Sequence, residues 1–258
     1  MLRFKSLGSG SAGNATVVEG SNGLQVTRLL VDCGLGLKVL DARLAQAGLH
    51  ASQIDAIFIT HEHGDHVGCA RQLSIRERLP VWMSAGTHAA IGRPDFEGLL
   101  QRAQDGVAID LGEIQIAPFT VPHDAREPLQ IRCSDGARHV GVLTDLGHAT
   151  PHVLAQLRGC SALLLECNHD AGLLAQSAYP GFLKERVGGR FGHLSNEDAA
   201  HIAGLLDHAG LVHVVAAHLS RQNNRPELAR EALAAALGRR AADIGVADQA
   251  TGSEWITA

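Results

Sequence analysis

The chain has 258 residues, 45% of them hydrophobic, which is enough to bury a sizeable core in a folded globular protein. A net charge of −5 argues against a tight non-specific DNA binder, so any recognition of phosphate must be local. No apolar run approaches the roughly 18 residues of a membrane span, and the first residues lack the apolar stretch of a secretory signal. We expect a cytoplasmic protein with no membrane partner.

Short runs rich in Val, Ile and Leu alternate with helical patterns along the chain. Strands are predicted at residues 15–20, 28–32, 54–59, 81–84, 113–121, 129–133, 139–145, 162–167, 211–217 and 244–249. Helices are predicted at residues 37–48, 67–79, 151–157, 196–210 and 226–238. Thr150 and Ser195 precede two of these helices and are residue types that cap helix N-termini well.

The order of these elements predicts an α/β (α+β) fold. Strand-rich stretches lie on both sides of the chain's middle, and each has its own helices, which is typical of two mixed sheets packed face to face with helices outside. No linker, repeat or low-complexity segment marks a boundary, so residues 1–258 are expected to form a single domain. The five cysteines have no CxxC spacing and are interpreted as reduced core residues.

The stretch THEHGDH, residues 60–66, gathers polar groups directly after an apolar strand. His61 and His63 are two residues apart, so both point the same way on an extended chain and can bind one metal ion. Asp65 and His66 follow at a predicted helix start, where they can face a second ion. The alternative is a solvated surface loop, but H-x-H-x-D-H is far more restrictive than an isolated histidine pair.

Two divalent ions need more ligands than this stretch supplies, and later strand ends provide them. His123, Asp145 and His218 each stand where an apolar strand gives way to a loop. Carboxylates are required because two dications about 4 Å apart repel by roughly 17 kcal/mol at an effective dielectric constant near 20. Asp145 is the natural bridge between the ions, with a solvent-derived hydroxide as the second bridge. The expected cofactors are two divalent ions, zinc or manganese, with iron as a further possibility.

These motifs resemble those of the metallo-β-lactamase fold hydrolases, whose four-layer αββα sandwich agrees with the predicted elements. The stretches SLGSGSAGN, LLVDCG, THEHGDH, VPHDA, LTDLGH, LECNHD, GHLSNEDAA and AHLSRQNN resemble the YycJ/WalJ branch, which is linked to 5′ to 3′ exonuclease action on DNA. The resemblance to tRNA 3′-processing endonucleases and to the phosphonate-pathway phosphodiesterase is more distant.

The resemblance assigns roles to individual residues. It implies that His61, His63 and His123 hold one metal, that Asp65, His66 and His218 hold the other, and that Asp145 bridges them. Asp65 is also expected to take part in catalysis. His193 and Glu166 match an acid beside the scissile phosphate and its supporting carboxylate, although the relatives read His-Ser-Thr where this chain has His-Leu-Ser. The alternative for His193 is a surface histidine ahead of a helix.

Four further residues are expected to hold a ligand in place or to contact substrate. Asp32 would orient a ligand imidazole, or would only bond backbone amides at a strand end. Asn14, in a glycine turn that lacks the lysine of a phosphate-binding loop, is predicted to face the metals. His169 is either a substrate contact or a packing residue. Arg190 belongs with Lys184 and Arg186 to a basic cluster that could equally be a solvated face.

The resulting function is phosphodiester hydrolysis by a metal-bridging hydroxide, most simply as a DNA exonuclease. The alternatives are a small-molecule phosphodiesterase, a thioester or lactone hydrolase of the same fold, and a non-catalytic protein that binds a phosphorylated ligand through metal. The expected partner is therefore DNA or a small phosphodiester. The sequence gives no sign of oligomeric state.

Overall fold

The computed structural model describes residues 1–258 and contains two seven-stranded sheets. The first sheet has the order β14-β1-β2-β3-β4-β5-β6. Its strands are β1 (Leu2–Gly8), β2 (Ala15–Ser21), β3 (Val26–Val31), β4 (Ala56–Phe58), β5 (Val81–Met83), β6 (Leu100–Arg102) and β14 (Ile256–Thr257). Strands β1 to β3 are antiparallel, whereas β3 to β6 are parallel. The sheet is therefore mixed, as predicted.

The second sheet has the order β13-β12-β11-β10-β9-β8-β7. Its strands are β7 (Ile109–Leu111), β8 (Ile114–Thr120), β9 (Leu129–Ser134), β10 (His139–Leu143), β11 (Ala162–Glu166), β12 (His213–Ala217) and β13 (Gly245–Val246). Strands β10 to β13 run parallel, so their carboxyl ends lie at one edge. Strand β8 ends at the same edge, because it is antiparallel to β9 and β9 is antiparallel to β10.

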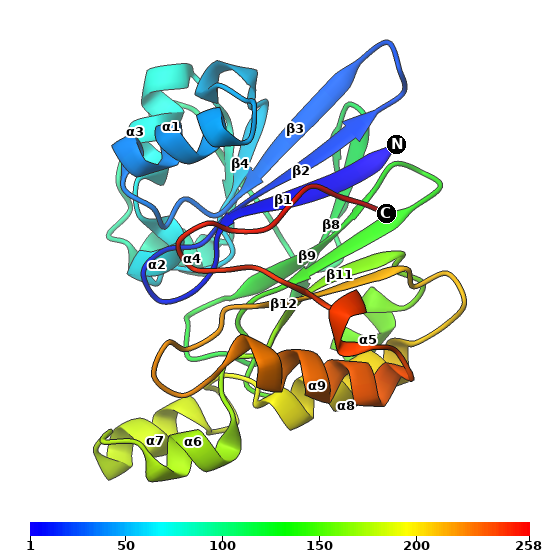
Figure 1. Ribbon diagram of the computed structural model, residues 1–258. Coiled ribbons are helices and arrows are strands. Elements are labelled where there is room, and N and C mark those ends of the chain that lie inside the picture. The colour runs from blue at the N-terminus through cyan, green and yellow to red at the C-terminus, as the bar shows by residue number, and fades with distance from the viewer.

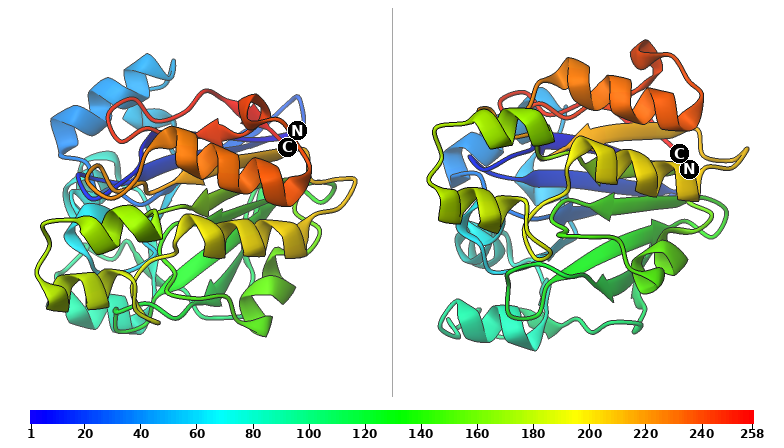
Figure 2. Two further views of the ribbon diagram at one scale, coloured as in Figure 1. Left: turned by 60° about the horizontal axis from the view of Figure 1, so that its bottom comes forward. Right: turned by 90° about the horizontal axis from the view of Figure 1, so that it is seen from below.

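Helices cover the outer face of each sheet (Figure 1). Helices α1 (Leu37–Gln46) and α3 (Ala70–Glu77) lie on the first sheet, and α5 (Pro151–Leu157), α8 (Asn196–Leu206) and α9 (Pro226–Leu237) lie on the second. Figure 2 shows α8 and α9 side by side across that sheet. The short helices are α2 (Gly64–Val67), α4 (Ala85–Ala90), α6 (Ala171–Gln176) and α7 (Gly181–Val187), and α6 and α7 project together from one end of the molecule.

Three apolar clusters show that the molecule has four layers. The middle cluster joins the facing surfaces of the two sheets, with Phe4 and Leu29 from the first and Val142 and Leu164 from the second. One outer cluster packs α1 and α3 on the first sheet, and the other packs α5, α8 and α9 on the second. The predicted αββα sandwich is therefore confirmed. All five cysteines are free and buried, as expected.

The element boundaries differ from the prediction in a few places. The helix predicted at residues 67–79 is divided at Gly68, where φ is 24°, because the backbone there packs against Cys33 and a Cβ would collide with the Cys33 carbonyl oxygen. The strand predicted to reach Asp145 ends at Leu143, which leaves Asp145 in the loop, and the helix predicted to reach residue 210 ends at Leu206. None of the helices combines the length and apolarity needed to cross a membrane.

Candidate metal centre

The predicted ligand residues meet at the carboxyl ends of strands from both sheets. His61 and His63 follow β4 of the first sheet, and His63 caps the N-terminus of α2, which carries Asp65 and His66. His123, Asp145 and His218 follow β8, β10 and β12 of the second sheet. The two sheets therefore contribute ligands to one site, and each group stands at the end of a buried, rigid strand.

Four overlapping groups of side chains have the spacing of a metal site; two of them contain Asp145, and the other two consist of three side chains each without it. In His61, His63 and His123, one nitrogen of each imidazole lies within 4.8 Å of the others. Asp65, His66 and His218 form the second group by the same criterion. These are the two groups that the sequence predicts, and the structure brings their side chains together; their binding of metal stays a prediction.

Asp145 lies between the two groups. Its Oδ2 is 3.0 Å from His66 Nε2, and its Oδ1 is 3.7 Å from His123 Nε2 and 3.6 Å from His218 Nδ1. Asp145 is fully buried, so only a strong compensating interaction can stabilise its charge there. Its position between both groups is the position that a bridging ligand requires.

Two buried atoms of this cluster make no hydrogen bond, His61 Nε2 and Asp145 Oδ2, although Asp145 Oδ2 has an ion-pair contact of 3.0 Å with His66 Nε2. An unpaired buried polar atom costs about 1–3 kcal/mol, and a cation bound by both atoms would remove that cost. Imidazole nitrogens together with carboxylate oxygens form a donor set that suits zinc, manganese and iron. The residues therefore fit the two-metal site that the sequence predicts.

Asp32 contacts the second group through His66. It follows β3 with a left-handed backbone conformation, φ 62°, and its Oδ2 lies 2.8 Å from His66 Nδ1. Its Oδ1 accepts a hydrogen bond of 2.9 Å from the backbone N–H of Thr60. Asp32 therefore does both things that were considered for it. It orients the His66 ring, and it bonds a backbone amide at Thr60, directly before the loop that carries His61 and His63.

Glu166 and His193 form a pair beside Asp145. The fully buried Glu166, the last residue of β11, places Oε1 2.7 Å from His193 Nδ1 and 3.2 Å from His218 Nδ1. Its Oε2 accepts backbone hydrogen bonds from Leu146 and Leu194, which follow β10 and precede α8. One carboxylate therefore positions both imidazoles and joins the loop that carries Asp145 to the loop that carries His193.

The protonation states follow from burial and from the carboxylates. Burial lowers the pKa of His61 and of His123 below the usual range of an imidazole. Burial also disfavours the charged form of His218, but Asp145, Asp65 and Glu166 outweigh it and raise its pKa to about 10. The same balance raises the pKa of His66, through Asp145 and Asp32, and of His193, through Glu166.

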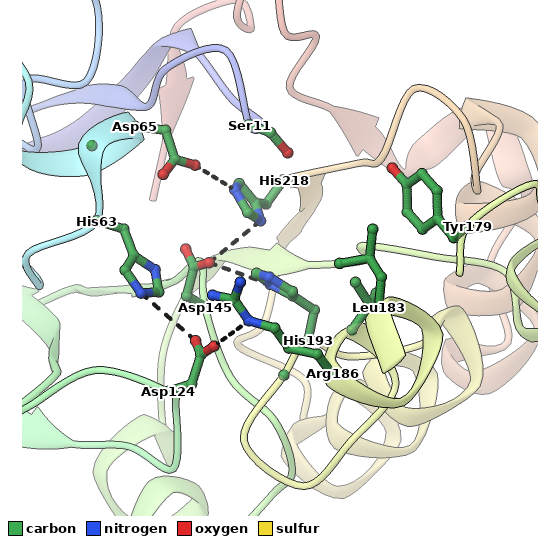
Figure 3. A pocket seen from close by; sticks show the side chains of 13 residues that line it. Ser11, His63, Asp65, Asp124, Asp145, Tyr179, Leu183, Arg186, His193 and His218 are labelled. Atoms are coloured by element: carbon green, nitrogen blue, oxygen red, sulfur yellow. Dashed lines mark hydrogen bonds and ion pairs between the residues drawn. The ribbon is translucent and has the colours of Figure 1, made fainter. Parts of the chain in front are cut away.

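A pocket of about 430 Å³ opens onto the ligands (Figure 3). His63, Asp65, Asp145, His193 and His218 line it together with residues that the sequence does not assign to the site, namely Ser11, Asp124, Tyr179, Leu183 and Arg186. In Figure 3, Asp124 lies between His63 and Arg186. Its carboxylate is 3.7 Å from His63 Nε2 and accepts a 2.7 Å hydrogen bond from Arg186 Nε.

Three of the predicted contacts lie in different surroundings. Asn14 is buried against the second group, with Nδ2 3.0 Å from His66 Nε2 and 3.4 Å from Asp65 Oδ2. His169 is buried outside the pocket, where its backbone pairs with the segment that leads into α8. The exposed Arg190 also stands outside the pocket, and only its carbonyl oxygen is bonded, by His148 Nδ1.

Asp124 and Arg186 left weak signals in the sequence. Asp124 directly follows His123 in VPHDA, and Arg186 belongs to the basic cluster noted there. Neither signal separates a pocket residue from a solvated one. Only the fold shows that Arg186, on α7, lines the pocket, whereas Lys184 and Arg190 do not.

Comparison with known proteins identifies the family. The model of the β-lactamase superfamily domain matches residues 27–219. The chain belongs to the metallo-β-lactamase superfamily. Within it, the chain is 33% identical to exodeoxyribonuclease YycJ of Bacillus anthracis, over 95% of this chain and 93% of the relative. It is 32% identical to exodeoxyribonuclease WalJ of Streptococcus pneumoniae, over 95% and 91%.

Solved structures of the superfamily share this architecture. The metallo-β-lactamase fold protein YhfI of Bacillus subtilis superposes with a TM-score of 0.75 at 18% identity, and the match covers all of both chains. The two mixed sheets with flanking helices are thus those of the metallo-β-lactamase fold. As a member of this superfamily with clustered His and Asp side chains, the chain is a hydrolase with a candidate metal site.

Proposed function

We propose that this protein is a dinuclear-metal phosphodiester hydrolase that removes nucleotides from the ends of DNA. The observation that carries the proposal is the convergence of two ligand groups on Asp145, with the buried Nε2 of His61 left without a partner. Full-length similarity to two proteins named exodeoxyribonucleases supports DNA as the substrate. The two ions would be zinc or manganese, held by the seven residues described above.

Bound at this site, two divalent ions would supply Lewis-acid chemistry and would lower the pKa of bound water to about 7. The protein's own groups would then direct the reaction. Asp65, which lines the pocket, can accept a hydrogen bond from the attacking water. His193 lines the same pocket, and Glu166 outweighs the effect of burial and raises its pKa, which favours the protonated imidazole. It can donate that proton to the departing oxygen while Glu166 holds its other nitrogen.

The charges around the pocket agree with a phosphodiester. Arg186 is the one cationic side chain of Lys or Arg type that lines it, and its guanidinium can bind a phosphate oxygen. Asp124 shares that guanidinium and holds it beside His63. An uncharged lactone offers Arg186 only a neutral carbonyl oxygen, which binds a guanidinium more weakly than an anionic phosphate does, so the pocket favours the phosphodiester over a lactone.

The experiment compares four substrates with metal-loaded protein. DNA labelled at the 5′ or 3′ end, bis-p-nitrophenyl phosphate, S-lactoylglutathione and a simple lactone are each incubated with wild type and with Asp145→Ala. We expect metal-dependent release of nucleotides from one end of DNA, slow hydrolysis of the small diester, and loss of both activities in Asp145→Ala. The labelled end from which products first appear gives the polarity.

Three other results would each replace the proposal. Cleavage of the small diester but not of DNA would make the protein a small-molecule phosphodiesterase. Turnover of the thioester or lactone alone would place it among the other hydrolases of the fold. Tight binding of a phosphorylated ligand without any product would make it a non-catalytic binder.

A further inference from the structure

The metal pocket continues into a groove on the side of β12. The pocket shares Ser11 and Tyr179 with a second cavity of about 260 Å³. That cavity shares Ser220, Arg221 and Gln249 with a third cavity of about 270 Å³. We call the second and third cavities together the side groove. Because neighbouring cavities share walls, the side groove forms one path that leads away from the candidate metal centre.

The side groove is mainly basic, whereas the metal pocket is mainly acidic. No carboxylate lines the second cavity, and Asp248 is the only one in the third. The Asp248 carboxylate accepts hydrogen bonds from Ala250 and Thr251 of its own loop, so that loop already compensates its charge. The same cavity is also lined by Arg221 and Arg225. In a chain with a net charge of −5, two arginines beside an anion-processing site indicate an anionic ligand.

Both arginines keep donors free for such a ligand. Arg221 is exposed, and no protein acceptor bonds its guanidinium. Arg225 is also exposed and bonds only the Asn224 carbonyl oxygen, at 2.6 Å through Nη1. A guanidinium has five N–H donors, so both side chains can bind phosphate oxygens without breaking an ion pair of the fold.

Tyr179 stands where the pocket and the side groove meet. It is the only tyrosine of the chain, is half-buried, and lies at the pocket rim away from Asp124 in Figure 3. No protein group bonds its hydroxyl, so the fold does not need the hydroxyl for its own hydrogen bonds. An aromatic ring beside a basic groove is the combination that single-stranded nucleic acid uses, with bases on the ring and phosphates on the arginines.

We propose that the side groove binds the single DNA strand that continues from the scissile phosphate, with Tyr179 stacking a base and Arg221 and Arg225 binding phosphates. This inference rests on the proposed function, because it takes the metal pocket as the site of cleavage. It adds that the substrate is single-stranded where it crosses Tyr179 and that recognition does not depend on base sequence.

The first test is the direct binding of a fluorescein-labelled oligothymidylate of about 12 nucleotides to metal-free protein, followed by fluorescence anisotropy. Arg221→Ala/Arg225→Ala is compared with Arg102→Ala/Arg158→Ala, which removes the same charge from exposed arginines outside the groove. We expect the groove variant to bind at least tenfold more weakly and to lower the salt slope by about 1.4, as two lost phosphate contacts require. The control variant should bind like wild type.

The second test uses metal-loaded protein and reports on Tyr179. We expect Tyr179→Leu to reduce the ratio of kcat/KM for the oligonucleotide to kcat/KM for bis-p-nitrophenyl phosphate by about tenfold, which is the loss of one stacked base. Tyr179→Phe, which keeps the ring, should restore most of the ratio. If Tyr179→Phe lowers the ratio as much as Tyr179→Leu does, the hydroxyl rather than the ring is needed, which would contradict the stacking role.

The outcomes distinguish a failure of the groove proposal from a failure of the proposed function. The groove proposal fails if wild type does not bind the oligonucleotide, or if the groove and control variants bind equally well. The proposed function fails instead if metal-loaded wild type hydrolyses neither substrate, even though binding depends on Arg221 and Arg225 as described.

Discussion

At the scale of single residues, Asp32 shows how the fold prepares a ligand. One carboxylate oxygen faces His66 Nδ1, and the other holds the Thr60 amide, so the imidazole presents Nε2 to the site. Asp32 and His218 both have positive φ, 62° and 54°, at strand ends beside the metal centre. Such a conformation costs free energy in a non-glycine residue, and it persists where the surroundings fix it for function.

We predict that Asp32→Asn lowers metal affinity by about 10–100-fold, because the neutral amide no longer supports the basicity of His66. Asparagine tolerates the left-handed conformation, so the fold should be kept, as circular dichroism would verify. The measurement is a zinc titration in competition with a chelator. Unchanged affinity would show that Asp32 serves only the backbone.

Protonation gives a second prediction at this scale. In the metal-free protein the pKa of His218 is about 10 and that of His66 is raised, so both are protonated at pH 7, whereas a ligand nitrogen must be neutral. The pKa values of Asp65 and Asp145 are lowered and those of His61 and His123 are lowered too, so these four ligands hold no proton to release at that pH.

Metal binding at pH 7 should therefore release about two protons, and affinity should rise as the pH increases towards 10. Calorimetry in two buffers of different ionisation enthalpy measures the number released. A value near zero, or an affinity that falls with rising pH in this range, would show that His66 and His218 are not ligands.

The residue types that the sequence identified are those whose position is fixed by a buried strand. His61, His123, Asp145 and His218 follow apolar strands within a few residues, and strand ends at one sheet edge lie close together. Asp124 also follows such a strand, but its contact with Arg186 depends on the phase of α7. The sequence does not show which face of α7 points towards the pocket, because none of the α7 residues is buried and no apolar pattern marks an inner face.

At the scale of elements, α2 carries two ligands against the end of β3. Asn14 N–H bonds the Asp65 carbonyl, and Cys33 N–H bonds the His66 carbonyl, both at 2.8 Å. The backbone of Gly34 touches the Asp65 carbonyl group so closely that a Cβ would overlap it. The distance between α2 and β3, and hence the position of both ligands, thus depends on the absence of a side chain at residue 34.

We predict that Gly34→Ala displaces α2, costs about 1–3 kcal/mol of stability by overpacking, and removes the metal held by Asp65 and His66. Gly36→Ala is the matched control, because nothing lies within 4 Å of a Cβ there and its φ of −63° suits alanine. Thermal unfolding and metal content are measured for both variants. Equal metal content in the two would contradict the account.

Most of the elements that sequence reasoning missed are short, and the exceptions are strand β1 and helix α7, which have seven residues each. Strands β6 and β7 have three residues each and β14 has two, and helices α4 and α6 have six residues. Such segments have too few residues to show a period, and they form because their neighbours offer hydrogen bonds or apolar contacts. Apart from β1 and α7, the longer elements were predicted because their buried faces repeat over several turns or pairs.

At the scale of the whole molecule, the candidate metal centre draws its residues from both sheets. His61, His63, Asp65 and His66 belong to the first sheet and its connections, and His123, Asp145 and His218 to the second. The αββα layering could be predicted because each half of the chain carries its own strands and helices. The side groove could not, because Tyr179, Arg221 and Gln249 are far apart in sequence, and only Arg221 lies in one of the quoted motifs.

Because the ions would tie the two sheets together, removing them should destabilise the entire fold. At a free metal concentration 100 times the Kd, one ion contributes about 2.7 kcal/mol to stability. For a chain of this size each kcal/mol corresponds to about 2–4 °C, so EDTA should lower Tm by at least about 5 °C. Calorimetry with and without EDTA measures this, and an unchanged Tm would mean that the ligands hold no structural ion.

The count of metal ions bound to purified protein, by elemental analysis, tests the central claim most directly. The account predicts two equivalents per chain in the wild type, about one in His61→Ala/His63→Ala, and fewer than one in Asp145→Ala. A wild type that takes up no metal, or a single ion that survives the loss of His61 and His63 together with Asp145, would contradict it.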